Sequence, residues 1–254
     1  MPDAIRAVLF DKDGTLFDFF ATWAPAYEAL ARHAAGDDPA LVERLMTLGG
    51  RDPATGRFAP HSVLAAGTAR QLAELWGAEI GRADIAELTV YFDAHFHSHG
   101  IASAQPVTDL PALFRRLRAR GLRLGVATMD SHAAAEATMQ AFGLDHMLDF
   151  VAGWDAGHGI KPGPGMVQAF SAAVAVPVDA IAVVGDTPHD LEMAHAAGAG
   201  LAVGVLTGAS PRETLAPRAH HVLDSIADLE ALLDQLSLSR TAGEGGAQPA
   251  GLGG

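Results

Sequence analysis

The six residues DKDGTL, positions 11–16, decide the fold of this chain and much of its chemistry. They follow an apolar run at residues 5–10 that contains two β-branched side chains, a composition typical of a short buried strand. Asp11 and Asp13 are therefore expected where a strand ends and a loop begins. Open α/β sheets carry their functional groups at such strand ends.

Both aspartates have a chemical use. A carboxyl group has a reference pKa of about 4, so Asp11 would be ionised at neutral pH and could act as a nucleophile without a separate base. Asp13, two residues on, could serve as acid and base. Gly14 permits a backbone turn that is closed to other residues. An Asp-rich turn that only ends a strand is the alternative, and this stretch alone does not exclude it.

Composition narrows the classes of partner. The chain has 254 residues, 49% of them hydrophobic, which is enough for one large domain or two small ones. Its 17 Lys and Arg against 30 Asp and Glu give a formal net charge of -13, which argues against nucleic acid and anionic membranes as partners. The chain has no cysteine, so disulfides and thiolate metal sites are excluded. An acidic enzyme that acts on an anionic substrate needs a local cation, either a metal or placed Lys and Arg.

The first residues lack a basic segment followed by a long apolar run, and no 18-residue apolar stretch follows. We therefore expect a cytoplasmic location.

Residues 18–102 carry helical apolar spacing and no alternation of strands with helices. Between two of the predicted helices lies the turn-rich segment GGRDPATGRFAPH, residues 49–61, which we expect to be an exposed loop. The pattern predicts an inserted helical domain. Its helices are expected at residues 25–35, 39–48, 68–76 and 83–96.

From residue 105 onward strands and helices alternate, which predicts right-handed crossovers and a parallel sheet. The predicted fold class is α/β: a Rossmann-like parallel sheet core with helices on both faces, plus the inserted all-helical domain. The predicted core comprises residues 1–17 and 103–240, the helical domain residues 18–102, and a flexible C-terminal tail residues 241–254. Strands are expected at residues 122–128, 150–153, 180–184 and 201–205, with a small edge strand near 222–223.

Polar residues recur at the ends of these later strands. Thr128 ends one strand, Lys161 lies in GIKPGPG after the next, and Asp186 and Asp190 lie in GDTPHD after a third. Each has a plain alternative: a strand cap, a surface lysine, or an acidic first turn of a helix. If the sheet is parallel, all four would meet Asp11, and the carboxylate oxygens of the aspartates would suit Mg²⁺.

In this order and placement, DKDGTL, Thr128, Lys161 and GDTPHD resemble the motifs of the haloacid dehalogenase superfamily of phosphotransferases. The chain is similar to the branch that carries a helical cap inserted after the first motif, which includes phosphoglycolate phosphatases. The resemblance implies a phosphatase that hydrolyses a small phosphate monoester.

The resemblance also implies a role for each motif residue. Asp11 would attack phosphorus to form an aspartyl-phosphate. Asp13 would protonate the leaving alcohol and then activate water. Thr128 and Lys161 would hold the phosphoryl oxygens.

Mg²⁺ is the implied cofactor. It would be bound by Asp11, by Asp13 through its backbone carbonyl, and by Asp186, with Asp190 in support. An anionic nucleophile that meets a phosphate dianion needs such cationic help.

The helical cap is expected to discriminate between leaving groups. Arg51, Arg57 and His61 lie in the turn-rich loop, and the arginines could bind a carboxylate or a second anionic group of the substrate. The alternative is that both arginines point into solvent. Met129 stands where many phosphoglycolate phosphatases carry Asn, which leaves the particular substrate open.

Two other functions stay open. A small sugar phosphomutase of the same superfamily keeps all four motifs. A non-catalytic binding or regulatory protein on this scaffold would be expected to have lost at least one of them. Asp13 argues against a dehalogenase or phosphonatase, and no GxGxxG follows the first strand as dinucleotide binding would require.

Overall fold

The computed structural model describes residues 4–59 and 62–244. Within these residues the strands form one six-stranded sheet of order β3-β2-β1-β4-β5-β6, and every neighbouring pair is parallel. The first strand of the chain therefore lies in the middle of the sheet. The strands are β1 (Ala7–Phe10), β2 (Arg123–Ala127), β3 (Phe150–Ala152), β4 (Ile181–Gly185), β5 (Leu201–Val205) and β6 (His221–Leu223).

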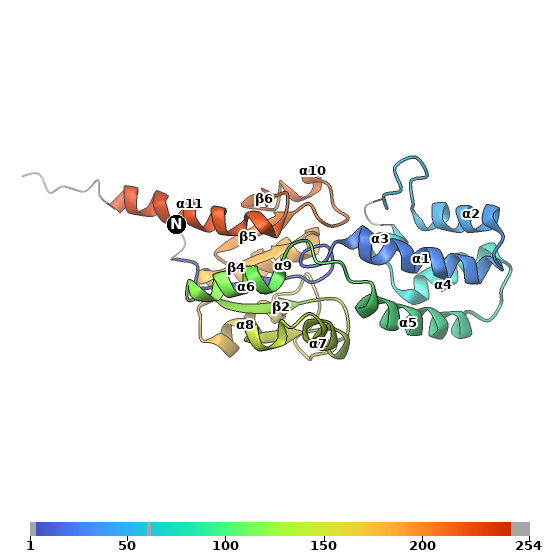
Figure 1. The fold of residues 1–254 in the computed structure, drawn as a ribbon, viewed down its shortest axis with the longest axis horizontal. Coiled ribbons are helices and arrows are strands. Elements are labelled where there is room, and N and C mark those ends of the chain that lie inside the picture. Colours follow the sequence, from blue (N-terminus) through green and yellow to red (C-terminus); the bar gives the residue numbers. More distant parts are fainter. Residues whose placement is uncertain (1–3, 60–61, 245–254) are drawn as a thin grey trace, which may run out of the picture.

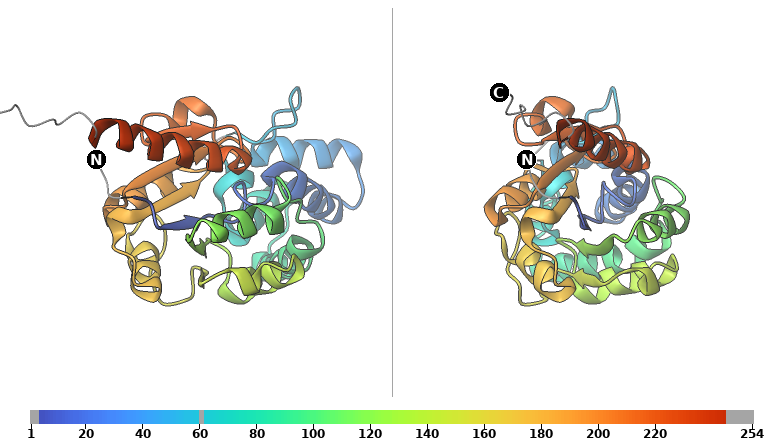
Figure 2. Two further views of the ribbon diagram at one scale, coloured as in Figure 1. Left: turned by 60° about the vertical axis from the view of Figure 1, so that its left-hand side comes forward. Right: turned by 90° about the vertical axis from the view of Figure 1, so that its left-hand side faces the viewer.

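Helices cover both faces of this sheet, as the α/β prediction requires, and Figure 2 shows the layers from two further directions. One apolar cluster joins the strands to α6 (Leu110–Ala119), α7 (His132–Ala141) and α11 (Leu229–Glu244). The other joins them to α8 (Gly165–Val174), α9 (Pro188–Ala197) and the short α10 (Arg212–Leu215). Brief 3-10 turns lie at Asp145–Met147, Val178–Ala180 and Ile226–Asp228.

The remaining helices form a layer of their own, here called the helical segment. They are α1 (Phe19–Ala35), α2 (Pro39–Gly49), α3 (Val63–Ala66), α4 (Ala69–Glu79) and α5 (Ile85–Ala102). Figure 1 shows them gathered at one end of the molecule, beyond the sheet. They share an apolar cluster of their own that includes Trp76 and Phe92. The division into a core and an inserted cap at residues 18–102 is compatible with this arrangement and stays a prediction.

Some predicted helix bounds were wrong. Helix α1 begins at Phe19 and not at Pro25, because the Asp18 carboxylate accepts a hydrogen bond from the Ala21 amide and caps the helix there. The short helix α3 was not predicted.

At the C-terminus, α11 continues to Glu244, so residues 241–244 are helical and not a tail. The remainder of the predicted tail, residues 245–254, lies outside the described residues. Among the helices of the described part of the chain, none has the length and apolar character needed to cross a membrane.

Candidate active site

The register of the central strands brings the first and last motifs together. Phe10 in β1 is level with Val126 in β2 and with Val184 in β4. Asp11 follows Phe10, and its amide donates to the Val184 carbonyl at 2.8 Å. Thr128 and Asp186 therefore leave the sheet on either side of Asp11, at the carboxyl ends of their strands, as the sequence predicted.

Lys161 reaches this edge from the loop between β3 and α8. It is only 5% exposed, and its Nζ forms ion pairs with Asp11 Oδ1 and with Asp190 Oδ1, the latter at 2.5 Å. Burial opposes the positive charge, but Asp11 and Asp190 outweigh burial and raise the pKa of Lys161. Lys161 is therefore a fixed cation beside the candidate nucleophile, and not a surface lysine.

Asp186 is buried with one oxygen engaged and one free. Its Oδ2 accepts from the Ala209 amide at 3.1 Å, whereas its Oδ1 has no hydrogen-bond partner among the described residues.

Two glycines make room for the Asp186 carboxylate. A Cβ at Gly14 would lie 2.4 Å from Asp186 Oδ2, and one at Gly208 would lie 1.7 Å from the same atom. Gly14 also has φ +86°, a conformation that favours glycine.

Asp190 has both oxygens engaged. Oδ1 pairs with Lys161, and Oδ2 accepts from the amide and the hydroxyl of Thr187, at 3.0 and 2.6 Å. Thr187 in turn accepts from the Asp190 amide, which completes a capping box at the start of α9. Asp190 therefore holds Lys161 and the helix terminus in place.

These carboxylates fit a divalent cation. Asp11, Asp186 and Asp190 each offer one oxygen, and the three oxygens lie within 4.8 Å of one another. The pKa of Asp11 is raised to about 7, mainly because the carboxyl group is buried. The positive charge of Lys161 opposes this shift, and the negative charge of Asp190 adds to it. The pKa of Asp186 is also raised, mainly by burial and further by the negative charges of Asp11 and Asp190. Lys161 alone does not balance three clustered acids, and the free oxygen of Asp186 supplies a ligand atom for a hard cation such as Mg²⁺.

Asp13 lies beside this cluster with both oxygens in contact. Its Oδ2 forms a 3.0 Å ion pair with Lys12, and its Oδ1 accepts from the Trp23 indole N–H at 3.1 Å. Lys12 is buried and also pairs with Asp130 at 3.0 Å. Burial opposes the charge of Lys12, but Asp13 and Asp130 raise its pKa. Sequence reasoning missed Lys12, Trp23 and Asp130.

Thr128 is buried, and its Oγ1 accepts from the Asp130 amide at 3.1 Å. The hydroxyl proton can be donated to a phosphoryl oxygen. The neighbouring Met129 is exposed.

The two arginines of the turn-rich loop have different surroundings. Arg51 is paired with Glu28 at 3.2 Å and with Glu43, so its guanidinium is held within the helical segment. Arg57 donates to the Gly208 carbonyl at 3.5 Å and lies over the Phe20 ring at 4.4 Å. Arg57 thus reaches the loop that touches Asp186, whereas the Arg51 guanidinium is already paired with two glutamates. His61 lies outside the described residues.

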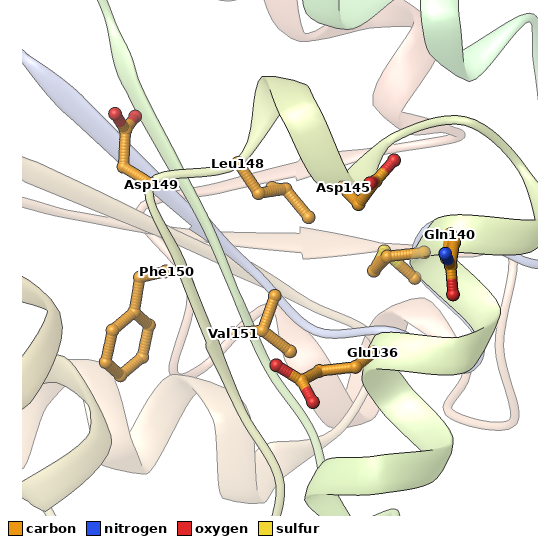
Figure 3. Close-up of a pocket in the computed structure, with 8 residues that line it drawn as sticks. Glu136, Gln140, Asp145, Leu148, Asp149, Phe150 and Val151 are labelled. Atoms are coloured by element: carbon orange, nitrogen blue, oxygen red, sulfur yellow. The ribbon is translucent and has the colours of Figure 1, made fainter.

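A hollow of about 460 Å³ lies elsewhere, at the β3 edge of the sheet. Figure 3 shows Glu136 and Gln140 of α7 on one side of it and Phe150 and Val151 of β3 on the other. None of the predicted site residues lines it. Its acidic side chains make it a poor receptor for a phosphate, so the carboxyl edge of the sheet is the better candidate site.

Comparison with known proteins agrees with this geometry. Residues 5–198 match the family model of the haloacid dehalogenase-like hydrolases. The chain belongs to this family. The resemblance drawn from the sequence is thereby confirmed.

The chain is 30% identical over 252 residues to a phosphoglycolate phosphatase of Rhodospirillum rubrum. The aligned region covers 96% of this chain and 97% of the relative. Together with the family, this similarity indicates a phosphoric monoester hydrolase.

Solved structures confirm the fold of this hydrolase. One from Haemophilus somnus, named as a predicted phosphoglycolate phosphatase, aligns with a TM-score of 0.69 at 20% identity over 90% of this chain and 97% of that chain. One from Thermotoga maritima, named as a candidate β-phosphoglucomutase, aligns with a TM-score of 0.69 at 17% identity over 91% of this chain and 99% of that chain. Proteins named for different reactions share this fold, so the fold alone does not choose between them.

Proposed function

We propose that this hydrolase is a Mg²⁺-dependent phosphatase that releases phosphate from a small phosphate monoester through an aspartyl-phosphate at Asp11. The observation that carries the proposal is the acid cluster at the end of β1. Asp11, Asp186 and Asp190 have oxygens within 4.8 Å of one another, and the buried Lys161 pairs with two of these residues. Phosphoryl transfer depends on such positioning and charge neutralisation.

In the first step Asp11 attacks phosphorus and the bond to the leaving oxygen breaks. Asp13 gives its proton to that oxygen, so the alcohol leaves neutral. Lys161 and the Thr128 hydroxyl hold the phosphoryl oxygens and offset their charge. When bound by Asp11, Asp186 and the Asp13 carbonyl, Mg²⁺ would add the positive charge that a single lysine does not supply.

In the second step Asp13, now a carboxylate, takes a proton from water. The water attacks phosphorus, the bond to Asp11 breaks, and inorganic phosphate forms. Asp190 keeps Lys161 in place through both steps, because its Oδ1 is the second partner of that cation.

We further propose that residues 18–102 act as a cap that closes over the leaving group. The contacts of Trp23 with Asp13 and of Arg57 with Gly208 support this, because both join the helical segment to the catalytic edge. Phosphoglycolate, the substrate named for the Rhodospirillum rubrum relative, is a candidate substrate. The proposed partner is thus a small molecule and neither nucleic acid nor membrane, and the cytoplasmic location stays a prediction.

A sugar phosphomutase of the same family remains the alternative. The similarity to the Rhodospirillum rubrum phosphatase favours hydrolysis, since it spans both chains almost completely. The presence of Asp11, Asp13, Lys161 and Asp186 together speaks against a non-catalytic scaffold.

The test is a panel of small phosphate monoesters, assayed with Mg²⁺ for free phosphate and for isomer formation. Phosphate release, with the phosphoryl group found on Asp11 by mass spectrometry of acid-quenched enzyme, is the expected result. Isomer formation without phosphate release would establish the mutase. A phosphoryl group on a His or Ser would overturn the mechanism.

A further inference from the structure

The Asp13 carboxylate is held from two sides by residues to which the family resemblance gives no role. The Trp23 indole N–H donates to Oδ1 at 3.1 Å, and Lys12 Nζ pairs with Oδ2 at 3.0 Å. Trp23 belongs to α1 of the helical segment, whereas Lys12 lies in the loop after β1. The orientation of one carboxylate thus depends on two parts of the molecule.

Lys12 has a second anchor. It is 1% exposed and also pairs with Asp130 Oδ2 at 3.0 Å, as a buried cation requires compensating charge. The Asp130 amide donates to Thr128 Oγ1, and its Oδ1 accepts from the Ser131 amide at 2.8 Å. Lys12 therefore ties Asp13 to the loop that carries the candidate phosphate ligand Thr128.

Trp23 is fixed by packing. Its ring lies 5.9 Å from that of Phe96 in an edge arrangement, and a Cβ at Gly100 would lie 3.0 Å from the indole. Phe96 and Gly100 belong to α5, the helix through which the chain returns to the core (Figure 1). The indole cannot shift far unless α1 and α5 shift with it.

A buried indole often finds an acceptor merely to satisfy its N–H. Trp76, in the same segment, does so by donating to the Leu45 carbonyl at 2.8 Å. Trp23 differs because its acceptor is a carboxylate of the core, across the boundary between the two parts of the molecule. Trp76 is thus a matched control for Trp23.

We propose that Trp23 and Lys12 are positioning residues for Asp13, and that Trp23 makes the orientation of this carboxylate depend on the seating of the helical segment over the core. The inference rests on the proposed function, in which Asp13 passes a proton to the leaving oxygen. Neither residue touches phosphorus. Proton transfer is geometrically competent only while both contacts are made.

The kinetic test compares Trp23→Phe with Trp76→Phe, since each change removes an indole N–H and keeps an aromatic ring. An alkyl phosphate needs its leaving oxygen protonated, whereas 4-nitrophenyl phosphate does not. Trp23→Phe should lower kcat/KM for the alkyl ester about 10-fold, a part of the roughly 10²- to 10⁴-fold that acid-base catalysis contributes. Its kcat/KM for the aryl ester should stay within about 2-fold, because kcat/KM reports the steps up to departure of the leaving group and not the later step in which Asp13 activates water.

Trp76→Phe should leave kcat/KM for both esters unchanged even where it lowers Tm. Equal losses of Trp23→Phe on both esters, or no loss on either, would overturn the proposal.

A second measurement does not depend on turnover. The chain has three tryptophans, so its ¹H–¹⁵N spectrum has few indole resonances. The resonance that disappears in Trp23→Phe is that of the Trp23 indole N–H. Asp13→Asn should shift the Trp23 resonance and leave that of Trp76 in place. An unmoved Trp23 resonance would overturn the inference. A shifted resonance in a protein that releases no phosphate would instead reject the proposed function and keep the contact.

Lys12 is tested by Lys12→Met, which keeps most of the side-chain volume, and by Asp130→Asn, which removes only the second anchor. Both variants should lower kcat/KM for the alkyl ester more than for the aryl ester. The loss should be larger in Lys12→Met than in Asp130→Asn, and Lys12→Arg should recover part of the activity that Lys12→Met loses. Should Lys12→Met fail to fold, Asp130→Asn still decides: an equal effect on the two esters removes Lys12 from the proposal.

Discussion

The carboxyl edge of the sheet and the helical segment use charge in different ways. At the sheet edge, Lys12 and Lys161 are buried, and each lies between two carboxylates. In the helical segment several ion pairs lie at the surface, where water competes for both partners. They are Arg44–Glu79, Arg70–Glu74 and Arg82–Glu87.

This difference teaches where substitutions should matter. Exposed pairs contribute about 0–1 kcal/mol to stability, whereas burying a charge costs several kcal/mol unless its partners are well placed. The buried charges at the sheet edge are therefore not expected to be there for stability, and a role in the reaction explains them better. Substitutions of the buried charges should alter the reaction, and substitutions of the exposed pairs should have little effect on it.

The largest effect is expected from Asp11→Asn. The amide cannot attack phosphorus, so turnover should fall below detection, while Lys161 keeps Asp190 as a partner and the fold persists. Phosphate release and Tm are the two measurements.

Asp149→Asn is the matched control in the core. Asp149 lies at the opposite end of the sheet and accepts from Arg118, Arg123 and the Leu124 amide. This change should lower Tm and keep kcat. Residual turnover in Asp11→Asn near the wild-type level would remove Asp11 from the mechanism.

Asp13→Asn should have the next largest effect. We expect a loss of about 10²- to 10⁴-fold in kcat/KM for alkyl esters, the usual size of general acid catalysis, because kcat/KM reports the step in which the alcohol leaves. The loss should be smallest for an aryl ester that needs no proton. Identical losses across leaving groups of different basicity would mean that Asp13 has only a structural role.

Much of this site could be predicted because parallel strands end at one edge of a sheet. Asp11, Thr128 and Asp186 each follow an apolar run, and the pairing of β1 with β2 and β4 places them side by side. Their types and order identified the family without coordinates. The bounds of β5 also agree with the strand predicted at residues 201–205.

The contacts of Lys12 and Trp23 could not be predicted in this way. A lysine after a strand resembles a surface residue, although its place between two aspartates was a signal that could have been weighed. The Trp23 contact depends on how α1 packs on the core, which no local pattern specifies.

Arg51 and Arg57 show the same limit within one loop. Arg51 pairs with Phe58 in an antiparallel bridge, so Arg57 points to the other side of the chain. Turn-rich composition predicts a loop but not which of its side chains faces the site.

Magnesium binding should have an intermediate effect that is visible without substrate. A cation that binds only the folded protein stabilises it by about 2.7 kcal/mol at a hundred times its Kd. Mg²⁺ should therefore raise the Tm of chelator-treated protein, and Asp186→Asn should abolish the rise, because the free oxygen of Asp186 is then lost.

Asp190→Ala should weaken Mg²⁺ binding less than Asp186→Ala does, because both Asp190 oxygens already serve Lys161 and Thr187. Asp149→Asn again serves as the control that keeps the Mg²⁺ response. An equal Mg²⁺ shift in Asp186→Asn and the wild type would place the cation elsewhere.

The smallest effect, and the one that bears most on the helical segment, is expected from Arg57→Ala. Arg57 is exposed, and within the described residues its guanidinium contacts the Gly208 carbonyl through a long hydrogen bond and lies over the Phe20 ring. Most of its N–H groups can therefore turn to an incoming anion. Removing it should lower kcat/KM for a carboxylate-bearing ester such as phosphoglycolate by about 1.5–3 kcal/mol, the range for a hydrogen bond to a charged group. Hydrolysis of an aryl phosphate without a second anionic group should change little.

Arg51→Ala supplies the control from the same loop. Its guanidinium is already paired with Glu28 and Glu43, so both kcat/KM values should persist, with at most about 1 kcal/mol lost in stability. Arg57→Lys should recover only part of the loss, because an ammonium does not match a carboxylate with two parallel hydrogen bonds. If Arg57→Ala affects both esters equally, the loop only holds the helical segment against the core. If Arg51→Ala instead lowers kcat/KM for the carboxylate-bearing ester more than Arg57→Ala does, the contact that sets specificity comes from Arg51. The proposed contrast between the two arginines would then be wrong.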